Sequence, residues 1–185
     1  ATVGLVVVTL SVLHVARVAR VVLHESDARG RLLANAIFHR AREVVPGNAD
    51  PFGALRDDPG MRAILESSIY GENVTDATIV DTTGVVMVAS DRLQEGQRQP
   101  TREDLATVVD APGLLDQLRA IYTRGGRTLE VRQPLLLDDE AFGSIHIGIS
   151  TVLMRQELNA SLRPAINIAL GALVVAVVVA VILAQ

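Results

Sequence analysis

Apolar residues are spread unevenly along the chain, and the longest apolar run lies at its C-terminal end. From Ala165 to Ala184 the only polar side chain is Asn167. About twenty residues at ~1.5 Å per residue cross a hydrocarbon core of about 30 Å. We therefore expect residues 163–185 to form a transmembrane helix. Pro164 is expected to be a joint where this helix enters the bilayer, because proline deletes a helical hydrogen bond.

A second apolar run, of thirteen residues, opens the chain. It is too short to cross a bilayer, and it lacks the basic start and small-residue cleavage site of a secretory signal peptide. Since the chain begins without methionine and inside this run, we expect residues 1–23 to be the end of a first membrane anchor. The rest of that anchor is expected outside this sequence, with Arg17 and Arg20 among the lipid headgroups.

The helical pattern continues far beyond this first run. Val15, Val18 and Val22 recur at helical spacing. Because the first proline comes only at Pro46, the pattern predicts one helix from the N-terminus to about Val45. One small domain cannot cover so long a helix, so we expect a homodimer. The first helices of the two copies are expected to pair along Leu32, Leu33, Ala36 and Ile37.

Between the two apolar ends the pattern alternates between short helices and strands. The last predicted strand alternates most regularly, with isoleucine at every second position from Ile145 to Ile149. Ser150 follows it and can cap a closing helix that leads toward the membrane. The predicted elements are a turn-rich link over 51–59, a helix over 60–69, a hairpin of strands 77–81 and 85–89, a helix over 101–109 with Thr101 as its N-cap, a helix over 112–122, and a hairpin of strands 128–137 and 142–149.

These elements predict an α+β domain over residues 24–162, with an antiparallel sheet and helices on its faces. All 21 acidic residues lie between Glu25 and Glu157. The domain is therefore acidic, and nucleic acid is excluded as an expected partner because a phosphate backbone requires a basic face. Cysteine and lysine are absent, which removes disulfides, thiolate catalysis and Schiff-base chemistry. We find no hydrolase, metalloprotease, phosphate-loop or dinucleotide motif, and we expect neither catalysis nor a cofactor in this segment.

Three stretches resemble the single Cache domains, which are PAS-like extracytoplasmic sensors of bacterial histidine kinases and chemoreceptors. Residues 77–91 look like the central hairpin of that family, 129–135 like its third strand, and 143–150 like the last strand before the exit helix. The resemblance covers about residues 25–162. It implies a central antiparallel sheet, a homodimer, and a pocket for a small carboxylate or an amino acid outside the cytoplasm. It also implies a bacterial inner membrane as the location.

A carboxylate ligand needs arginine forks, hydroxyl groups or backbone amides in a concave site. Arg132 is the best charged candidate because a strand would fix its direction, and His146 lies on the polar side of the last strand. Alternatively, Arg132 is a solvated or ion-paired strand residue that binds no ligand. His146 is alternatively a half-buried histidine whose hydrogen bonds are made within the protein. The other candidate ligand-binding residues are Thr78, Ser90, Tyr122, Arg92, Arg98, Arg124 and Arg127.

Metal sites have weak support in the sequence. His39 and Glu43 lie four residues apart on the first helix, a spacing that can share a metal ion, but two ligands do not make a site. The acidic run 138–140 is expected to be a soluble hairpin tip. We expect no bound metal.

The leading functional hypothesis is the sensor region of a two-component histidine kinase. The alternatives are the same region of a methyl-accepting chemoreceptor and an envelope interaction module without a ligand. In the first two cases a ligand would displace the last strand, and Ser150 and Pro164 would relay that displacement through the exit helix.

Overall fold

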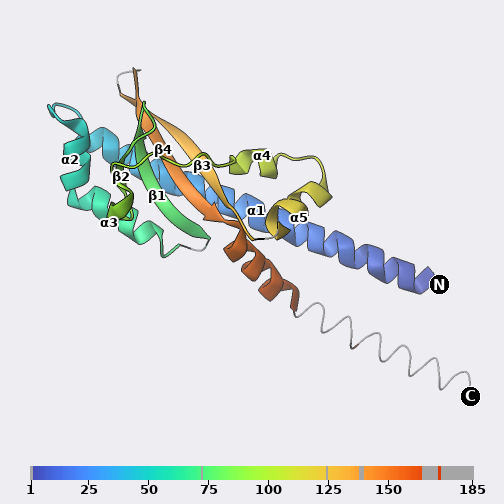
Figure 1. Cartoon of the computed structure of the whole chain (residues 1–185). Coiled ribbons are helices and arrows are strands. Elements are labelled where there is room, and N and C mark those ends of the chain that lie inside the picture. Colours follow the sequence, from blue (N-terminus) through green and yellow to red (C-terminus); the bar gives the residue numbers. More distant parts are fainter. Residues whose placement is uncertain (1, 72, 124, 138–139, 164–170, 172–185) are drawn as a thin grey trace, which may run out of the picture.

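The computed structural model describes residues 2–71, 73–123, 125–137, 140–163 and 171. They form an α+β arrangement in which one long helix lies behind a four-stranded antiparallel sheet (Figure 1). The predicted α+β class is therefore confirmed. The elements are α1 (Thr2–Val44), α2 (Pro51–Asp57), α3 (Pro59–Ser68), β1 (Val74–Asp81), β2 (Val86–Ala89), the 3₁₀ turn η1 (Arg92–Gln94), α4 (Leu105–Val109), α5 (Leu114–Tyr122), β3 (Thr128–Leu137) and β4 (Glu140–Ser150).

Helix α1 is one continuous helix of 43 residues, as predicted, and measures about 65 Å at ~1.5 Å per residue. It packs tightly against β3 and β4. At Gly30 an added Cβ would lie 2.7 Å from Val131 Cγ2 and 3.6 Å from Ile149 Cδ1. Glycine at this position therefore sets how closely the helix approaches the sheet.

The sheet has the order β2-β1-β4-β3, so β4 is an inner strand and β3 an edge strand. The isoleucines of β4 are buried and belong to the core that includes α1. Successive side chains of a strand point to opposite faces, so Ser144, His146 and Gly148 share the face away from α1. In the register, His146 lies between Thr78 and Arg132.

Residues 91–104, called the strap below, cross the face of the sheet that α1 leaves uncovered (Figure 1). One end pairs with the β2 edge through the bridge between Val85 and Arg98. At the other end, Glu130 N–H on the β3 edge donates to Glu103 O at 2.9 Å. The strap therefore runs from one outer edge of the sheet to the other.

Two local predictions are wrong. Residues 51–57 form α2 where a turn-rich link was expected, because Asp50 accepts a hydrogen bond from Gly53 N–H at 3.0 Å and a proline occupies the first turn. The helix expected from Thr101 begins only at Leu105, and Asp104 caps it. Thr101 lies in the strap, which must stay extended to reach β3.

Residues 151–163 form the exit helix, which leaves the sheet toward the same end of the molecule as the N-terminal half of α1 (Figure 1). The predicted cap is confirmed, since Ser150 Oγ accepts from Leu153 N–H at 3.4 Å. Among the residues that the structure describes, no helix combines the length and apolarity needed to cross a bilayer. The span expected over 163–185, including Pro164, lies outside the described residues apart from 163 and 171.

The face proposed for helix pairing in a dimer needs a correction. Ile37 is fully buried in the core of its own domain, so it is not available to a second copy. Leu32 is 69% exposed and Ala36 is also exposed. The dimer itself stays a prediction, with Leu32 and Ala36 as its remaining contacts.

An ion pair joins α1 to α3. Arg40 on α1 donates two hydrogen bonds to Asp58, at 2.8 and 2.7 Å, and Asp58 also caps α3 by accepting from Met61 N–H at 2.7 Å. The Arg40 guanidinium, followed by the Met61 amide, holds the pKa of Asp58 below its ordinary value. Its stabilising effect is therefore fully present above the unfolded pKa and is lost as pH falls through the folded one.

We predict that Asp58→Asn removes part of the acid sensitivity of the fold. Asparagine still caps a helix, so the variant loses the charge and keeps the cap. Urea unfolding from pH 7 down to pH 2 should show a stability gap between wild type and variant. The gap should be widest at neutral pH and should shrink below about pH 4. A gap that is constant over this range would contradict the assignment.

Candidate functional site

Polar side chains fill the sheet face beneath the strap. Four of them on the sheet are almost completely buried: Thr78 at 0%, Glu130 at 1%, and Asp76 and His146 at 5% exposure. Buried polar groups are costly unless they are hydrogen-bonded, and each of these four has partners in the same group. We call this group the polar cluster, and its members are Asp76, Thr78, Glu130, Arg132, Ser144 and His146 on the sheet and Gln99 and Arg102 on the strap.

A hydrogen-bonded chain runs across β3 and β4 through His146. Its Nδ1 lies 3.0 Å from Glu130 Oε2 and its Nε2 lies 2.8 Å from Ser144 Oγ. An ionised carboxylate can only accept, so Nδ1 donates to Glu130, while Nε2 and the Ser144 hydroxyl share a hydrogen bond. Arg132 donates to the other carboxylate oxygen of Glu130. The chain holds the imidazole in one orientation.

Hydroxyl, imidazole and carboxylate follow one another here in the order of a Ser-His-acid triad. Acyl transfer also needs backbone N–H groups free to bind an oxyanion. Ser144 lies on an inner strand, paired with Val80 on one side and Pro134 on the other. The geometry therefore supports an orienting role for Ser144 beside the imidazole.

An ion pair between sheet and strap lies directly over Gly148. Arg102 Nη1 donates to both oxygens of Asp76, at 3.0 and 2.8 Å, and Thr75 Oγ1 also donates to Asp76. An added Cβ at Gly148 would lie 2.3 Å from Asp76 Oδ1 and 2.6 Å from Arg102 Nη1. Only glycine leaves room for the pair, so this position is tied to the polar cluster and not to a turn.

A second strap contact is made by Gln99. Thr78 Oγ1 donates to Gln99 Oε1 at 3.3 Å. The amide nitrogen of Gln99 is buried and has no partner among the described residues. A buried donor without an acceptor costs about 1–3 kcal/mol. This nitrogen is therefore a donor ready for a ligand acceptor on the polar face.

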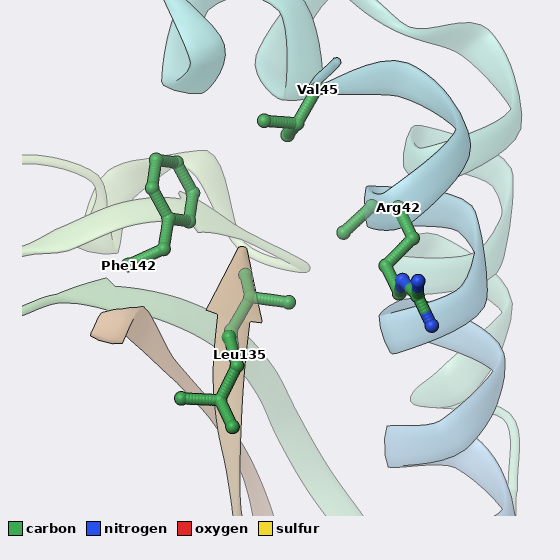
Figure 2. Close-up of a pocket in the computed structure, with 6 residues that line it drawn as sticks. Arg42, Val45, Leu135 and Phe142 are labelled. Carbon is green, nitrogen blue, oxygen red and sulfur yellow. The ribbon is translucent and has the colours of Figure 1, made fainter. Parts of the chain in front are cut away.

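A surface recess lies on the other side of the sheet, near the end of α1. It measures about 180 Å³ including open solvent and is lined by Ala41, Arg42, Val45, Leu135, Leu136 and Phe142 (Figure 2). Its walls are almost entirely apolar, and it shares no residue with the polar cluster. It has few groups that could orient a polar ligand, so we assign the candidate site to the polar cluster.

The predicted site residues separate into two groups in space. Arg132, His146 and Thr78 lie together in the polar cluster. Ser90 and Tyr122 lie elsewhere: Ser90 Oγ accepts from Ala77 N–H at 3.1 Å and supports the β1–β2 pairing. Tyr122 Oη donates to the side-chain oxygen of Asn159 in the exit helix at 2.8 Å, which ties α5 to that helix.

The loop arginines do not converge on the cluster. Arg92 lies in the exposed turn η1, and Arg98 is exposed beside Val85. Arg127 forms an ion pair with Glu103 at the β3 edge. Arg124 lies outside the described residues. Among the described residues no group of three potential metal ligands occurs, and Glu43 instead pairs with Arg40 at 2.9 Å.

The sequence prediction missed Asp76, Glu130, Gln99 and Arg102. A signal was present for Glu130, because its carboxylate lies between Leu129 and Val131 inside the predicted strand 128–137, where a charge is unusual. Asp76 lies one residue before the predicted strand 77–81. Gln99 and Arg102 carry no such signal. Their stretch has no periodicity, and only the path of the strap brings them over the sheet.

A further missed residue is Asn73, which joins three elements. Its φ of 69° is in the left-handed region, and asparagine tolerates this conformation better than most residues. Its carbonyl accepts from Ser150 N–H at 2.8 Å. Its side-chain amide donates to Glu157 on the exit helix at 2.7 Å and to Ser26 on α1 at 3.4 Å. The start of β1, α1 and the exit helix therefore meet at one side chain.

No protein-family model matches this chain, and the search of curated proteins also returns no match.

We predict that Gly148→Ala destabilises the fold by about 1–3 kcal/mol, the usual cost of overpacking, because the methyl group pushes Asp76 and Arg102 apart. In an Asp76→Ala background the same substitution should cost clearly less, since the obstructing carboxylate is gone. Urea unfolding of the four proteins in this cycle measures the coupling. Additive effects would show that Gly148 is not constrained by the ion pair.

Proposed function

We propose that this chain is the ligand-sensing region of a transmembrane signalling receptor, with the polar cluster as its ligand site. One observation carries the proposal. A buried polar face, closed by a strap, lies on the same inner strand that continues through Ser150 into the exit helix. The strand segments that resemble the single Cache sensors contribute Thr78, Arg132 and His146 to this face. The proposed domain is a Cache-like sensor outside the cytoplasm of a bacterial cell.

The ligand class follows from the charges of the cluster. Asp76 and Arg102 neutralise each other in the closed face. A free α-amino acid carries an ammonium and a carboxylate on the same carbon, so it can pair with Asp76 and Arg102 at once and leave neither charge unpaired. A simple carboxylate satisfies Arg102 but leaves Asp76 beside a second negative charge. We therefore propose an amino acid as ligand, with Gln99 Nε2 as an additional donor.

Entry of the ligand requires the strap to move. The strap reaches the polar face through Gln99 and Arg102, which are the groups that the ligand would engage. A ligand shifts the receptor only by its differential affinity for the two strap positions. Since Asn73 holds β1, β4, α1 and the exit helix together, a shift of β4 would reach the membrane-facing end of both helices.

We propose that the receptor carrying this region is a histidine kinase, with a methyl-accepting chemoreceptor as the alternative. A third hypothesis is an envelope interaction module that binds no ligand. In each of the first two, the chain would act as a homodimer in the inner membrane.

The ligand proposal is tested by thermal shift of the full chain in detergent micelles against the proteinogenic amino acids and small carboxylates. At a hundred times its Kd an amino acid should stabilise the chain by about 2.7 kcal/mol. Asp76→Asn and Arg102→Gln should each weaken the affinity for the amino acid by about tenfold or more, which lowers the stabilisation at the same ligand concentration to about 1.4 kcal/mol or less. Arg92→Gln, in the same segment but away from the cluster, is the matched control and should respond like wild type. If no amino acid stabilises the chain, the proposed ligand class is wrong.

The relay is tested by inserting a flexible Gly-Ser segment between Met154 and Leu162 in the receptor that carries this region. The insertion should leave ligand binding intact and abolish the ligand-dependent output, because the exit helix no longer transmits a displacement. A matched insertion of two helical turns of alanine keeps the helix rigid and should retain a response. Unchanged signalling after the Gly-Ser insertion would exclude the relay.

A further inference from the structure

A second charged group lies at the outer edge of β2, away from the polar cluster. Glu95 of the strap inserts its carboxylate between Arg56 of α2 and Arg62 of α3. Oε1 of Glu95 lies 3.1 Å from Arg62 Nη2 and accepts from Ala89 N–H at 3.3 Å. Oε2 faces Arg56 Nε at 3.4 Å. Two guanidinium groups and one backbone amide thus converge on a single carboxylate.

The donors hold their positions without help from Glu95. Arg62 is only 9% exposed, and it also donates to Ala89 O at 2.9 Å and to Arg56 O at 3.3 Å. Arg56 donates separately to Met87 O at 3.0 Å. The site is therefore preorganised by backbone carbonyls, which lowers the cost of binding an anion. We call Arg56, Arg62 and the N–H of Ala89 the carboxylate cradle.

Two features indicate that the cradle is built for an anion that can be exchanged. Its buried Arg62 Nε has no partner among the described residues, so the fork retains an unused donor. The segment that delivers Glu95 has little apolar packing at Leu93, which is 80% exposed, so mainly hydrogen bonds to Val86 attach it to β2. The Glu95 side chain itself is only 15% exposed.

We propose that the carboxylate cradle is a binding site for a small free carboxylate, which Glu95 fills in the unliganded chain. An incoming carboxylate displaces Glu95, because the cradle accepts one carboxylate at a time. Release of Glu95 detaches the first half of the strap from β2, where Gly96 N–H donates to Val86 O at 2.8 Å and Val86 N–H donates to Gln97 O at 2.9 Å. This site is independent of the amino-acid site proposed on the polar face.

The decisive variant is Glu95→Ala, which vacates the cradle. A tethered carboxylate competes at a local concentration in the millimolar range, so its removal should tighten acetate binding by about tenfold or more. At ten times its Kd, sodium acetate should raise the melting temperature of the full-length variant in detergent by about 4 °C relative to sodium chloride at equal ionic strength. Glu66→Ala, an exposed glutamate on α3, is the matched control and should show no such gain.

Further variants keep the test informative if Glu95→Ala folds poorly. Glu95→Gln fills the cradle with a neutral side chain of equal size and should bind acetate more tightly than wild type. Glu95→Gln combined with Arg62→Gln should lose the acetate response. If acetate and chloride act alike on both Glu95 variants, the carboxylate site is refuted. Asp76→Asn should leave the acetate response intact, which separates a failure here from a failure on the polar face.

Release of the strap from β2 is measured separately, by amide hydrogen exchange. In wild type, saturating acetate should speed deuterium exchange of the Gly96 and Val86 amides, while the Ile79 amide in the core stays protected. Acetate binding without faster exchange at Gly96 and Val86 would refute the displacement of the strap.

Discussion

The packing of the β4 isoleucines against α1 is the contact on which the rest of the structure depends. Because side chains alternate along a strand, burying Ile145, Ile147 and Ile149 against the helix forces Ser144, His146 and Gly148 onto the opposite face. A slip of one residue would bury the imidazole against α1 and expose the isoleucines. The apolar contact therefore fixes the register, and the register assembles the polar cluster.

A polar face of this kind needs a cover, and the strap supplies it. The strap is held at both outer edges of the sheet and closes over the face with Gln99 and Arg102. Its attachments consist of hydrogen bonds and ion pairs more than apolar packing. A ligand with charged or hydrogen-bonding groups can replace such contacts. It cannot replace the apolar packing of the isoleucine core. A rigid apolar side and an exchangeable polar side thus share the inner strand β4.

Both proposed sites use the same principle, in which the chain's own side chains occupy the place of a ligand. Asp76 and Arg102 satisfy each other on the polar face, and Glu95 satisfies the cradle at β2. Unpaired buried charges would cost several kcal/mol, so an unliganded domain has to neutralise them internally. Under the two proposals, ligand affinity is a difference between external and internal partners, and the strap position would depend on which partner is bound.

The sequence by itself determined the long first helix, both hairpins and the cap at Ser150, because these follow from local periodicity, turn residues and helix signals. It also indicated His146 through strand alternation and Arg132 through its position in a strand, whereas Thr78 followed from the family resemblance. The turn-rich link expected at 51–59 was wrong because Asp50 caps a helix there. The cap expected at Thr101 was wrong because Asp104 caps that helix instead. Only the tertiary structure decided that Arg102 meets Asp76, that Glu95 meets Arg62, and that Ile37 faces inward. The two ion pairs depend on the path of an aperiodic segment across the sheet, which has no local signature in the chain.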